Sequence, residues 1–165
     1  MKKILFAILL MAPLSLFAQK FAHFNSADII PNMKEYTKAM DELKTLGEQL
    51  ENDVKMMQDE FKTKLEAYQK EADKLLENVR ARREKDLAEL QSRLEQGLQD
   101  NQQAFQKAQA EKMQAINELV LAALKKVGEA GGYVYIVDTS NGVIPYVSAT
   151  LSTDITPEIK KALGM

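Results

Sequence analysis

Apolar residues recur at steps of three and four along the first half of the chain, which is the spacing of one face of an α-helix. The positions are Met33, Tyr36, Met40, Leu43, Leu46, Leu50, Val54, Met57, Phe61, Leu65, Tyr68, Ala72, Leu75 and Val79. Alternation of three and four is typical of a coiled-coil seam, where each helix buries one narrow stripe against a partner. The pattern therefore predicts a long helix that is paired along most of its length.

A second series with the same spacing follows. It comprises Leu87, Leu90, Leu94, Leu98, Phe105, Ala108, Met113, Ile116, Leu119, Ala123 and Val127. Between the two series the stripe loses its phase and the sequence reads NVRARREKD. We therefore expect the chain to reverse near Leu76 to Arg83, which makes an antiparallel helical hairpin. The alternative is one uninterrupted helix about 150 Å long.

Both ends of the helical region carry β-compatible sequence. The segment KFAHFN follows Gln19, and Ser26 or Asp28 after it could cap the next helix. Near the other end, residues 133–138 (YVYIVD) predict a strand, residues 139–142 a turn that ends in Asn-Gly, and residues 143–147 a second strand. Helices that fold back would bring the N-terminal strand beside this β-hairpin.

The strand YVYIVD is apolar at nearly every position, which predicts that both of its faces are covered. Three strands and two long helices supply too little core for both faces, so association of identical copies is the economical solution. The residues that we expect in this oligomerisation body are Phe21, Phe24, Val134, Ile136, Val143, Ile144 and Tyr146.

The chain closes with a short predicted helix, DITPEIKKAL. Thr156 suits its N-cap and Pro157 its first helical position. We expect Ile159 and Leu163 to pack this helix on the sheet.

The first 18 residues have the layout of a secretory signal peptide. Lys2 and Lys3 precede an apolar run that is too short to span a membrane, and Ala18 precedes polar Gln19. We expect cleavage near Ala18 and export to the periplasm of a bacterium.

Composition and charge exclude several functions. The chain has no cysteine, which excludes thiol catalysis and cysteine-ligated metals. Removal of Lys2 and Lys3 changes the formal net charge from −2 to −4, and an acidic chain lacks the basic face of a general nucleic-acid binder. His23 is the single histidine and has no evident catalytic partners. We expect no enzyme activity, no metal and no cofactor.

The order of these features resembles the Skp/OmpH family of periplasmic chaperones. The matching segments are FAHFNSADII, REKDL, YVYIVDTSNGVIPY and DITPEIKKAL. The resemblance implies an α+β fold in which a long antiparallel helical hairpin extends as a coiled-coil arm from a small β body, in a jellyfish-like homotrimer. It divides the chain into a signal peptide (1–18), the start of the body (19–30), the arm (31–130, with its tip near 76–83) and the rest of the body (131–165).

The resemblance also implies a function. Members hold unfolded outer-membrane proteins between their arms, prevent aggregation and use no ATP. The best-known members are strongly basic, whereas this mature chain is mildly acidic. The alternative from another class is a structural coiled-coil spacer or assembly protein of the cell envelope.

Two groups of residues are candidates for client contact. Arg80, Arg82, Arg83 and Lys85, together with Lys74, give residues 74–85 a net charge of +3, which could meet acidic client loops or anionic membrane lipids. The alternative for these residues is a solvated helix end. Met56 is the second candidate, because it lies off the seam and has a flexible apolar side chain.

Overall fold

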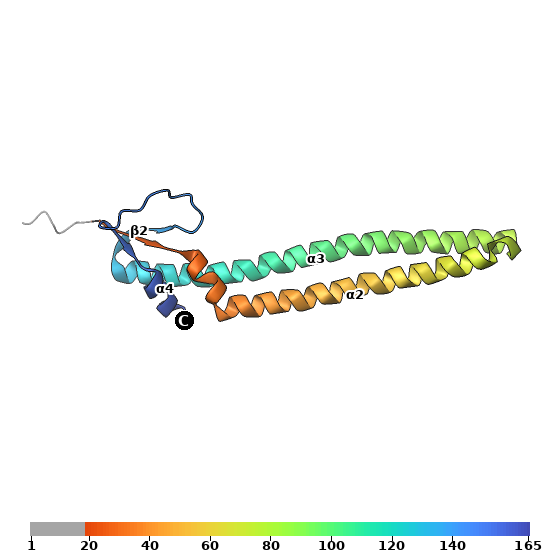
Figure 1. Cartoon of the computed structure of the whole chain (residues 1–165), viewed down its shortest axis with the longest axis horizontal. Helices are drawn as coiled ribbons and strands as arrows, with labels where there is room; N and C mark the ends of the chain where they lie inside the picture. The colour runs from red at the N-terminus through yellow and green to blue at the C-terminus, as the bar shows by residue number, and fades with distance from the viewer. Residues whose placement is uncertain (1–18) are drawn as a thin grey trace, which may run out of the picture. The chain divides into compact units, whose positions relative to one another are not determined.

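The computed structural model describes residues 19–165, so the predicted signal peptide lies outside the described residues. The elements follow in the order β1 (Lys20–Phe24), η2 (Ser26–Asp28), η3 (Ile30–Asn32), α2 (Lys34–Glu71), η4 (Ala72–Lys74), α3 (Glu77–Gly131), β2 (Tyr133–Asp138), β3 (Ser152–Asp154) and α4 (Thr156–Ala162), where η denotes a 3-10 helix (Figure 1). Two long helices and a small three-stranded sheet confirm the expected α+β class. None of the helices from residue 19 onward is long and apolar enough to cross a membrane.

The described residues divide into two compact units. Residues 34–117 form one, which we call the arm unit, and residues 19–33 with 118–165 form the other, which we call the sheet unit. Helix α3 contributes to both units, because the division falls between Asn117 and Glu118.

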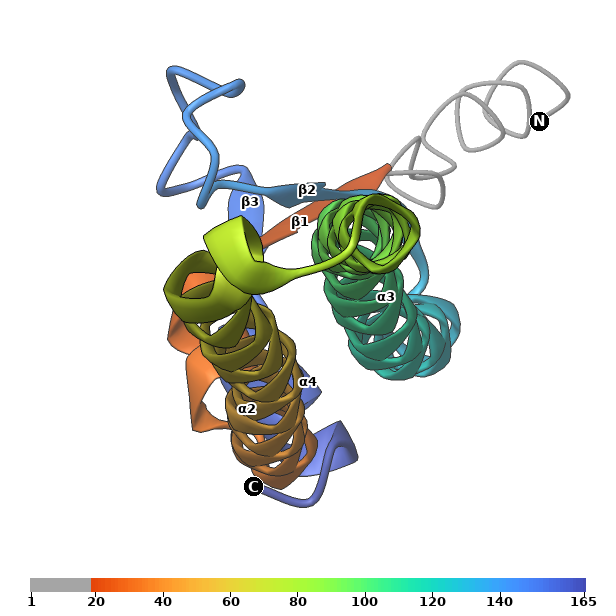
Figure 2. The ribbon, with the colours of Figure 1, turned by 90° about the vertical axis from the view of Figure 1, so that its right-hand side faces the viewer.

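The arm unit is an antiparallel pair of helices. In the view from the turn, α2 and α3 lie side by side (Figure 2). Contacts between them join later residues of α2 to earlier residues of α3, which is the pattern of an antiparallel pair. The contacts that show this are Glu42 with Lys112, Leu50 with Asn101, and Tyr68 with Glu84. The single uninterrupted helix is therefore wrong.

The chain reverses earlier than predicted. Helix α2 ends at Glu71, η4 follows, and Leu75 is extended with φ −78° and ψ 144° before α3 begins at Glu77. The predicted tip near 76–83 overlaps the turn only at Leu76, because 77–83 is already helix. Arg, Ala, Glu and Lys in this segment are good helix formers, so the lost apolar phase marked a stretch without a buried stripe and not a break in the helix.

The predicted seam is correct along α2. Every predicted position from Tyr36 to Leu75 is buried or partly shielded from solvent, although Val79 on α3 is 37% exposed. On α3 the seam slips at Leu98, which is 46% exposed, and Gly97 takes the shielded position instead. The shielded residues continue from Leu94 through Gly97 and Asn101 to Phe105. A search for apolar residues passes over Gly97 and Asn101.

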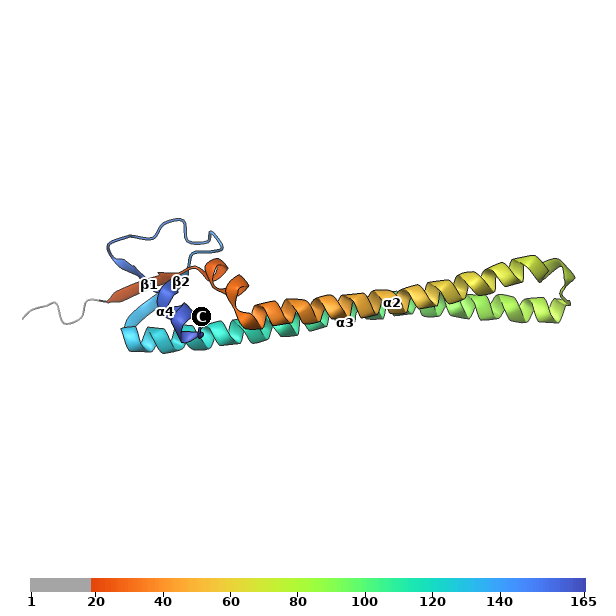
Figure 3. The same cartoon turned by 60° about the horizontal axis from the view of Figure 1, so that its bottom comes forward.

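The three strands of the sheet unit are all parallel. The order is β2-β1-β3, so the N-terminal strand lies in the middle, as the expected meeting of the two ends of the chain requires. The predicted β-hairpin is wrong. Residues 143–147 form no strand, and residues 139–151 make a long loop that returns to the start of β3 (Figure 3). β1 takes one edge of β2 and the other edge stays unpaired in the described chain, so the chain after β2 leaves the sheet without turning back on it.

One face of the sheet is covered within the chain. Ala22 and Phe24 of β1 are buried, and Ile136 of β2 points at α3, where a Cβ on Gly128 would lie 2.9 Å from its Cδ1. The absence of a side chain at Gly128 thus allows β2 to approach the helix. Other buried residues of this unit are Ile29, Met33, Val120, Ala123, Ile155 and Ile159. Val120 takes the place predicted for Leu119, which is 43% exposed.

The caps of the shorter helices differ from the prediction. The side chain of Asn25 accepts the Ala27 N–H at 3.0 Å, whereas Ser26 bonds elsewhere and does not cap a helix. Thr156 is the first residue of α4, and the residue before it, Ile155, occupies the N-cap. The acceptor for the Thr156 N–H is Oδ1 of Asp154 at 2.9 Å. The N-cap thus lies at Ile155 and not at Thr156, and helix boundaries commonly differ by one or two residues.

Candidate functional site

A carboxylate holds the carboxyl ends of β1 and β2 together. Oδ2 of Asp138 accepts the Ser26 hydroxyl at 2.6 Å, and Oδ1 accepts the backbone N–H groups of Ser26 at 3.2 Å and Ser140 at 2.9 Å. Burial raises the pKa of the Asp138 carboxyl, but the hydrogen bonds from Ser26 and Ser140 outweigh burial and bring the pKa below its ordinary value. The ionised form of Asp138 therefore fixes the start of the long loop after β2.

A second carboxylate organises the start of α4. Oδ1 of Asp154 accepts the Thr156 hydroxyl at 2.6 Å, and the Thr156 oxygen in turn accepts the backbone N–H of Asn25 at 3.1 Å. The bond from the Thr156 hydroxyl is the main reason that the pKa of Asp154 lies below its ordinary value. His23 pairs through Nδ1 with the Ser152 hydroxyl at 2.9 Å, which joins β1 to β3.

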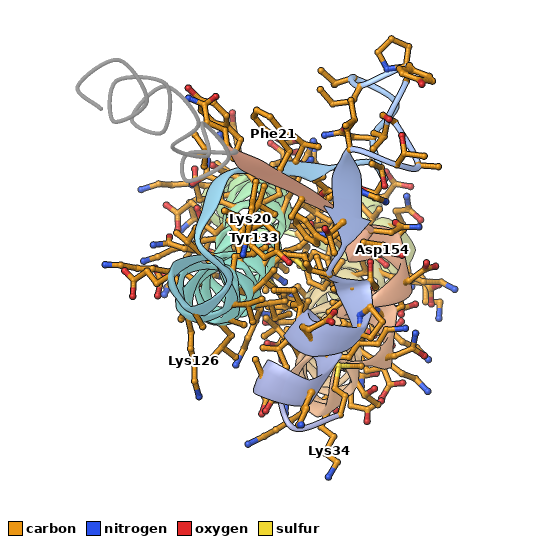
Figure 4. The ribbon with its side chains drawn as sticks, turned by 90° about the vertical axis from the view of Figure 1, so that its left-hand side faces the viewer. Lys20, Phe21, Lys34, Lys126, Tyr133 and Asp154 are labelled. Atoms are coloured by element: carbon orange, nitrogen blue, oxygen red, sulfur yellow. The ribbon has the colours of Figure 1, made fainter. Side chains whose placement is uncertain are left out.

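The other face of the sheet carries exposed aromatic rings. Phe21 and Tyr135 stack with ring centroids 6.3 Å apart and planes within 5° of parallel. Figure 4 shows Phe21 on the opposite side of β1 from the end of α3, with Lys20 and Tyr133 on the side towards the helix. Tyr135 is 67% exposed, so the stacked pair is an apolar surface that the chain itself leaves open.

The predicted oligomerisation residues fall into two groups. Phe24 is buried and Ile136 contacts the α3 side, so both serve packing within the subunit. Ile144 is partly shielded, and four residues are exposed: Phe21, Val134, Val143 and Tyr146. Tyr135 and Leu151, which the prediction omitted, are exposed as well. The signal for Tyr135 was present in the sequence as a large aromatic residue between the predicted positions Val134 and Ile136.

The loop after β2 and the outer edge of β2 are both unpaired. β2 is at the end of the strand order, so its second edge bonds to no strand of the described chain. Residues 143–147 read VIPYV and are β-compatible, although Pro145 cannot donate a hydrogen bond. Such an edge and such a segment are typical of a surface that pairs with another chain.

The predicted basic residues lie near the turn of the arm unit. Arg80, Arg82, Arg83 and Lys85 are exposed in the first turns of α3, and Lys85 is 3.6 Å from Glu89. A polar hollow of about 380 Å³ lies beside them, lined by Lys64, Tyr68, Arg83, Asp86, Leu87, Glu89 and Arg93. Side chains of both charges line this hollow, so it favours neither an anionic nor a cationic ligand.

The turn also carries apolar surface. Leu76 is 73% exposed and adjoins the basic residues, whereas Met56 is 64% exposed farther along α2 and is not part of this group. The sequence thus placed the basic residues near the turn correctly and missed Leu76, which lies off the predicted seam.

An apolar hollow lies between the helices of the arm unit, where the seam contains glycine and asparagine. Its volume is about 540 Å³, and its lining consists of Gly47, Leu50, Glu51, Val54, Leu98, Asn101, Gln102, Phe105 and Gln106. The sequence analysis did not find this hollow. Its signal was a glycine and an asparagine at seam positions of otherwise strong helices.

The residues from 19 to 165 contain no group of three or more His, Cys, Asp or Glu side chains that could hold a metal ion. Carboxylates lie along exposed helix faces, where several form pairs four residues apart, such as Glu60 with Lys64 at 2.6 Å.

Comparison with known proteins identifies the family. The family described as outer membrane protein (OmpH-like) matches residues 20–163. The chain belongs to the OmpH-like family.

A solved structure shares the OmpH-like fold. It is a crystal structure from Caulobacter crescentus of an OmpH-like protein assigned as an outer membrane chaperone. The TM-score is 0.75 at 12% identity, over 88% of this chain and 83% of the other. At this identity the likeness shows the fold alone. No curated protein sequence matches the chain.

Proposed function

We propose that this OmpH-like protein is an ATP-independent holdase chaperone of the periplasm, which encloses unfolded outer-membrane proteins between helical arms and prevents their aggregation. The observation that carries the proposal is membership of the OmpH-like family over residues 20–163, combined with a paired helical arm that offers apolar and polar surface but no metal-binding group in its described residues. Holding many different clients requires several weak contacts and no catalytic centre.

The proposed assembly is a homotrimer joined through the sheet units. Its support is the set of apolar side chains that a subunit leaves exposed on the sheet and the following loop, since neighbouring exposed apolar side chains often mark an interaction site. The residues that we assign to the interface are Phe21, Val134, Tyr135, Val143, Ile144 and Tyr146. The unpaired edge of β2 could receive residues 143–147 of a neighbouring copy.

The client surface is assigned to the arm unit. Arg80, Arg82, Arg83 and Lys85 near the turn, with exposed Leu76, suit acidic client loops or the anionic surface of a membrane. Met56 offers a separate apolar contact. Neither contact requires nucleotide hydrolysis, and release follows from competition with the client's own folding or with its next partner.

The decisive experiment is dilution of a urea-unfolded outer-membrane β-barrel protein into buffer with and without the mature protein, residues 19–165. We expect suppression of light scattering at about one trimer per client. Aggregation that proceeds unchanged at severalfold excess would exclude the holdase function. It would favour the alternative, a structural spacer of the envelope, which the long helices support equally well.

A further inference from the structure

The hollow in the arm unit occurs where the helix pair departs from an ordinary seam. Gly47 on α2 faces Phe105, whose Cε2 would be 3.5 Å from an added Cβ, and Gly97 on α3 faces Met57. Between these glycines, Asn101 donates from Nδ2 to the backbone oxygen of Leu50 at 3.0 Å. A glycine in a helix interior costs roughly 1 kcal/mol relative to alanine, so these positions do not serve the stability of the arm.

The lining of the hollow combines apolar carbon with unpaired amides. Leu50, Val54 and Phe105 are partly shielded, and Leu98 beside them is 46% exposed. In the described chain the side-chain amides of Gln102 and Gln106 make no hydrogen bond with another residue. Glu51 is the single charged residue of the lining, and no cation belongs to it.

This chemistry selects one class of occupant. The volume of about 540 Å³ falls within the range of roughly 300–1,000 Å³ that is usual for ligand-binding clefts, which leaves ample room for one large apolar side chain. Free amides beside an apolar surface can bond the N–H and C=O groups of an extended backbone. A lining with a carboxylate and no cation disfavours an anionic lipid or a phosphate.

We infer that this hollow is a binding site for single large apolar side chains, aromatic ones above all, of an extended and unfolded polypeptide. The inference rests on the proposed holdase function and names the site at which that function contacts its client. Gly47 leaves room beside Phe105, Leu98 and Phe105 provide the apolar contact, and Gln102 and Gln106 bond the client backbone.

The test uses the mature protein, residues 19–165, and an unstructured peptide of Gly, Ser and Asn with one photoreactive benzoyl-phenylalanine. Mass spectrometry then locates the crosslinks. We expect them within residues 47–54 of α2 and 98–106 of α3, and we expect competition by the same peptide with Phe but not with Asn at that position. Crosslinks spread evenly along both helices would overturn the inference.

Two variants test the site by different means. Gly47→Leu fills the hollow and raises helix propensity, so it should remove the crosslinks while circular dichroism stays helical. Leu98→Gln changes an exposed position, and it should weaken peptide binding about fivefold, as expected for partial loss of apolar burial. Leu76→Gln is the matched control, because Leu76 is exposed in the same unit but does not line the hollow.

The outcomes separate this inference from the proposed function. Equal binding losses in Leu98→Gln and Leu76→Gln would indicate general apolar attraction and overturn the site. Unchanged crosslinks in Gly47→Leu would also overturn the site. If the wild-type protein suppresses barrel aggregation while the crosslinks avoid the hollow, the site is wrong and the holdase function stands. If the wild-type protein fails to suppress aggregation but crosslinks in the hollow, the peptide site stands and the holdase function fails.

Discussion

The hydroxyl of Ser26 donates to Oδ2 of Asp138 at 2.6 Å, although 112 positions separate these residues in the sequence. With the two backbone N–H groups that Oδ1 accepts, this bond ties the end of the first strand to the end of the second. The sheet unit therefore depends on a contact between the two ends of the chain.

Asp138→Ala should lower the free energy of unfolding of the sheet unit by about 2 kcal/mol, because it leaves two N–H groups and a hydroxyl without their acceptor. Urea unfolding, together with hydrogen exchange of the β2 amides, measures the loss. Asp53→Ala on the exposed face of α2 is the control and should be nearly neutral. A wild-type exchange pattern in Asp138→Ala would contradict the role of this carboxylate.

Acid should destabilise the sheet unit through Asp138 and Asp154. Both carboxyl pKa values are lowered in the folded chain, so the unfolded chain binds protons first as the pH falls. The stability that these groups contribute is complete above about pH 4 and is lost as the pH falls through the lowered values. Thermal unfolding between pH 6 and pH 2 should show this loss, and Asp138→Asn should make the dependence on pH shallower. An unchanged slope in that variant would exclude Asp138 as a source.

The two seam glycines should respond differently to alanine. Gly47→Ala should raise the stability of the arm unit by up to about 1 kcal/mol, because the added Cβ makes an ordinary contact with Phe105. Gly97→Ala should gain less, because its Cβ would lie 3.1 Å from Cε of Met57, which would have to move. Thermal melts of both variants provide the comparison. A larger gain for Gly97→Ala would mean that Met57 does not occupy the seam.

Association should depend on Tyr135 and not on the buried face of the strand. Tyr135→Asp should dissociate the proposed trimer to folded monomers, because the side chain is exposed and stacks only on Phe21. Light scattering after size exclusion gives the mass, and circular dichroism gives the helix content. Ile136→Asp should unfold the sheet unit, because Ile136 packs against α3 at Gly128. A trimeric Tyr135→Asp variant would place the interface elsewhere.

The sequence predicted the elements whose signals are local and periodic. The α2 seam from Tyr36 to Leu75 could be placed because each turn of the helix repeats the same requirement. Leu98 was misplaced because a scan for apolar residues prefers leucine to the adjacent Gly97, although it is Gly97 that faces the Met57 side chain of α2.

Contacts between distant segments were harder to predict. The Asn-Gly pair after β2 favoured a hairpin, since a turn signal reports only on its neighbours. The partner of β2 is instead β1, which comes from the far end of the chain and pairs with both other strands. The hollow near Phe105 was missed for a related reason, because it depends on the pairing of Gly47 on α2 with Asn101 and Phe105 on α3.

The parallel sheet also has a consequence for the order of events during synthesis. Among the described elements β1 is synthesised first and β3 near the end, and β2 and β3 are bonded through β1 and not to each other. Almost the whole chain must therefore be made before the sheet can close, whereas the helices need only their neighbours across one turn. Because contacts of long sequence separation form slowly, the paired helices should form before the sheet through which we propose that copies associate.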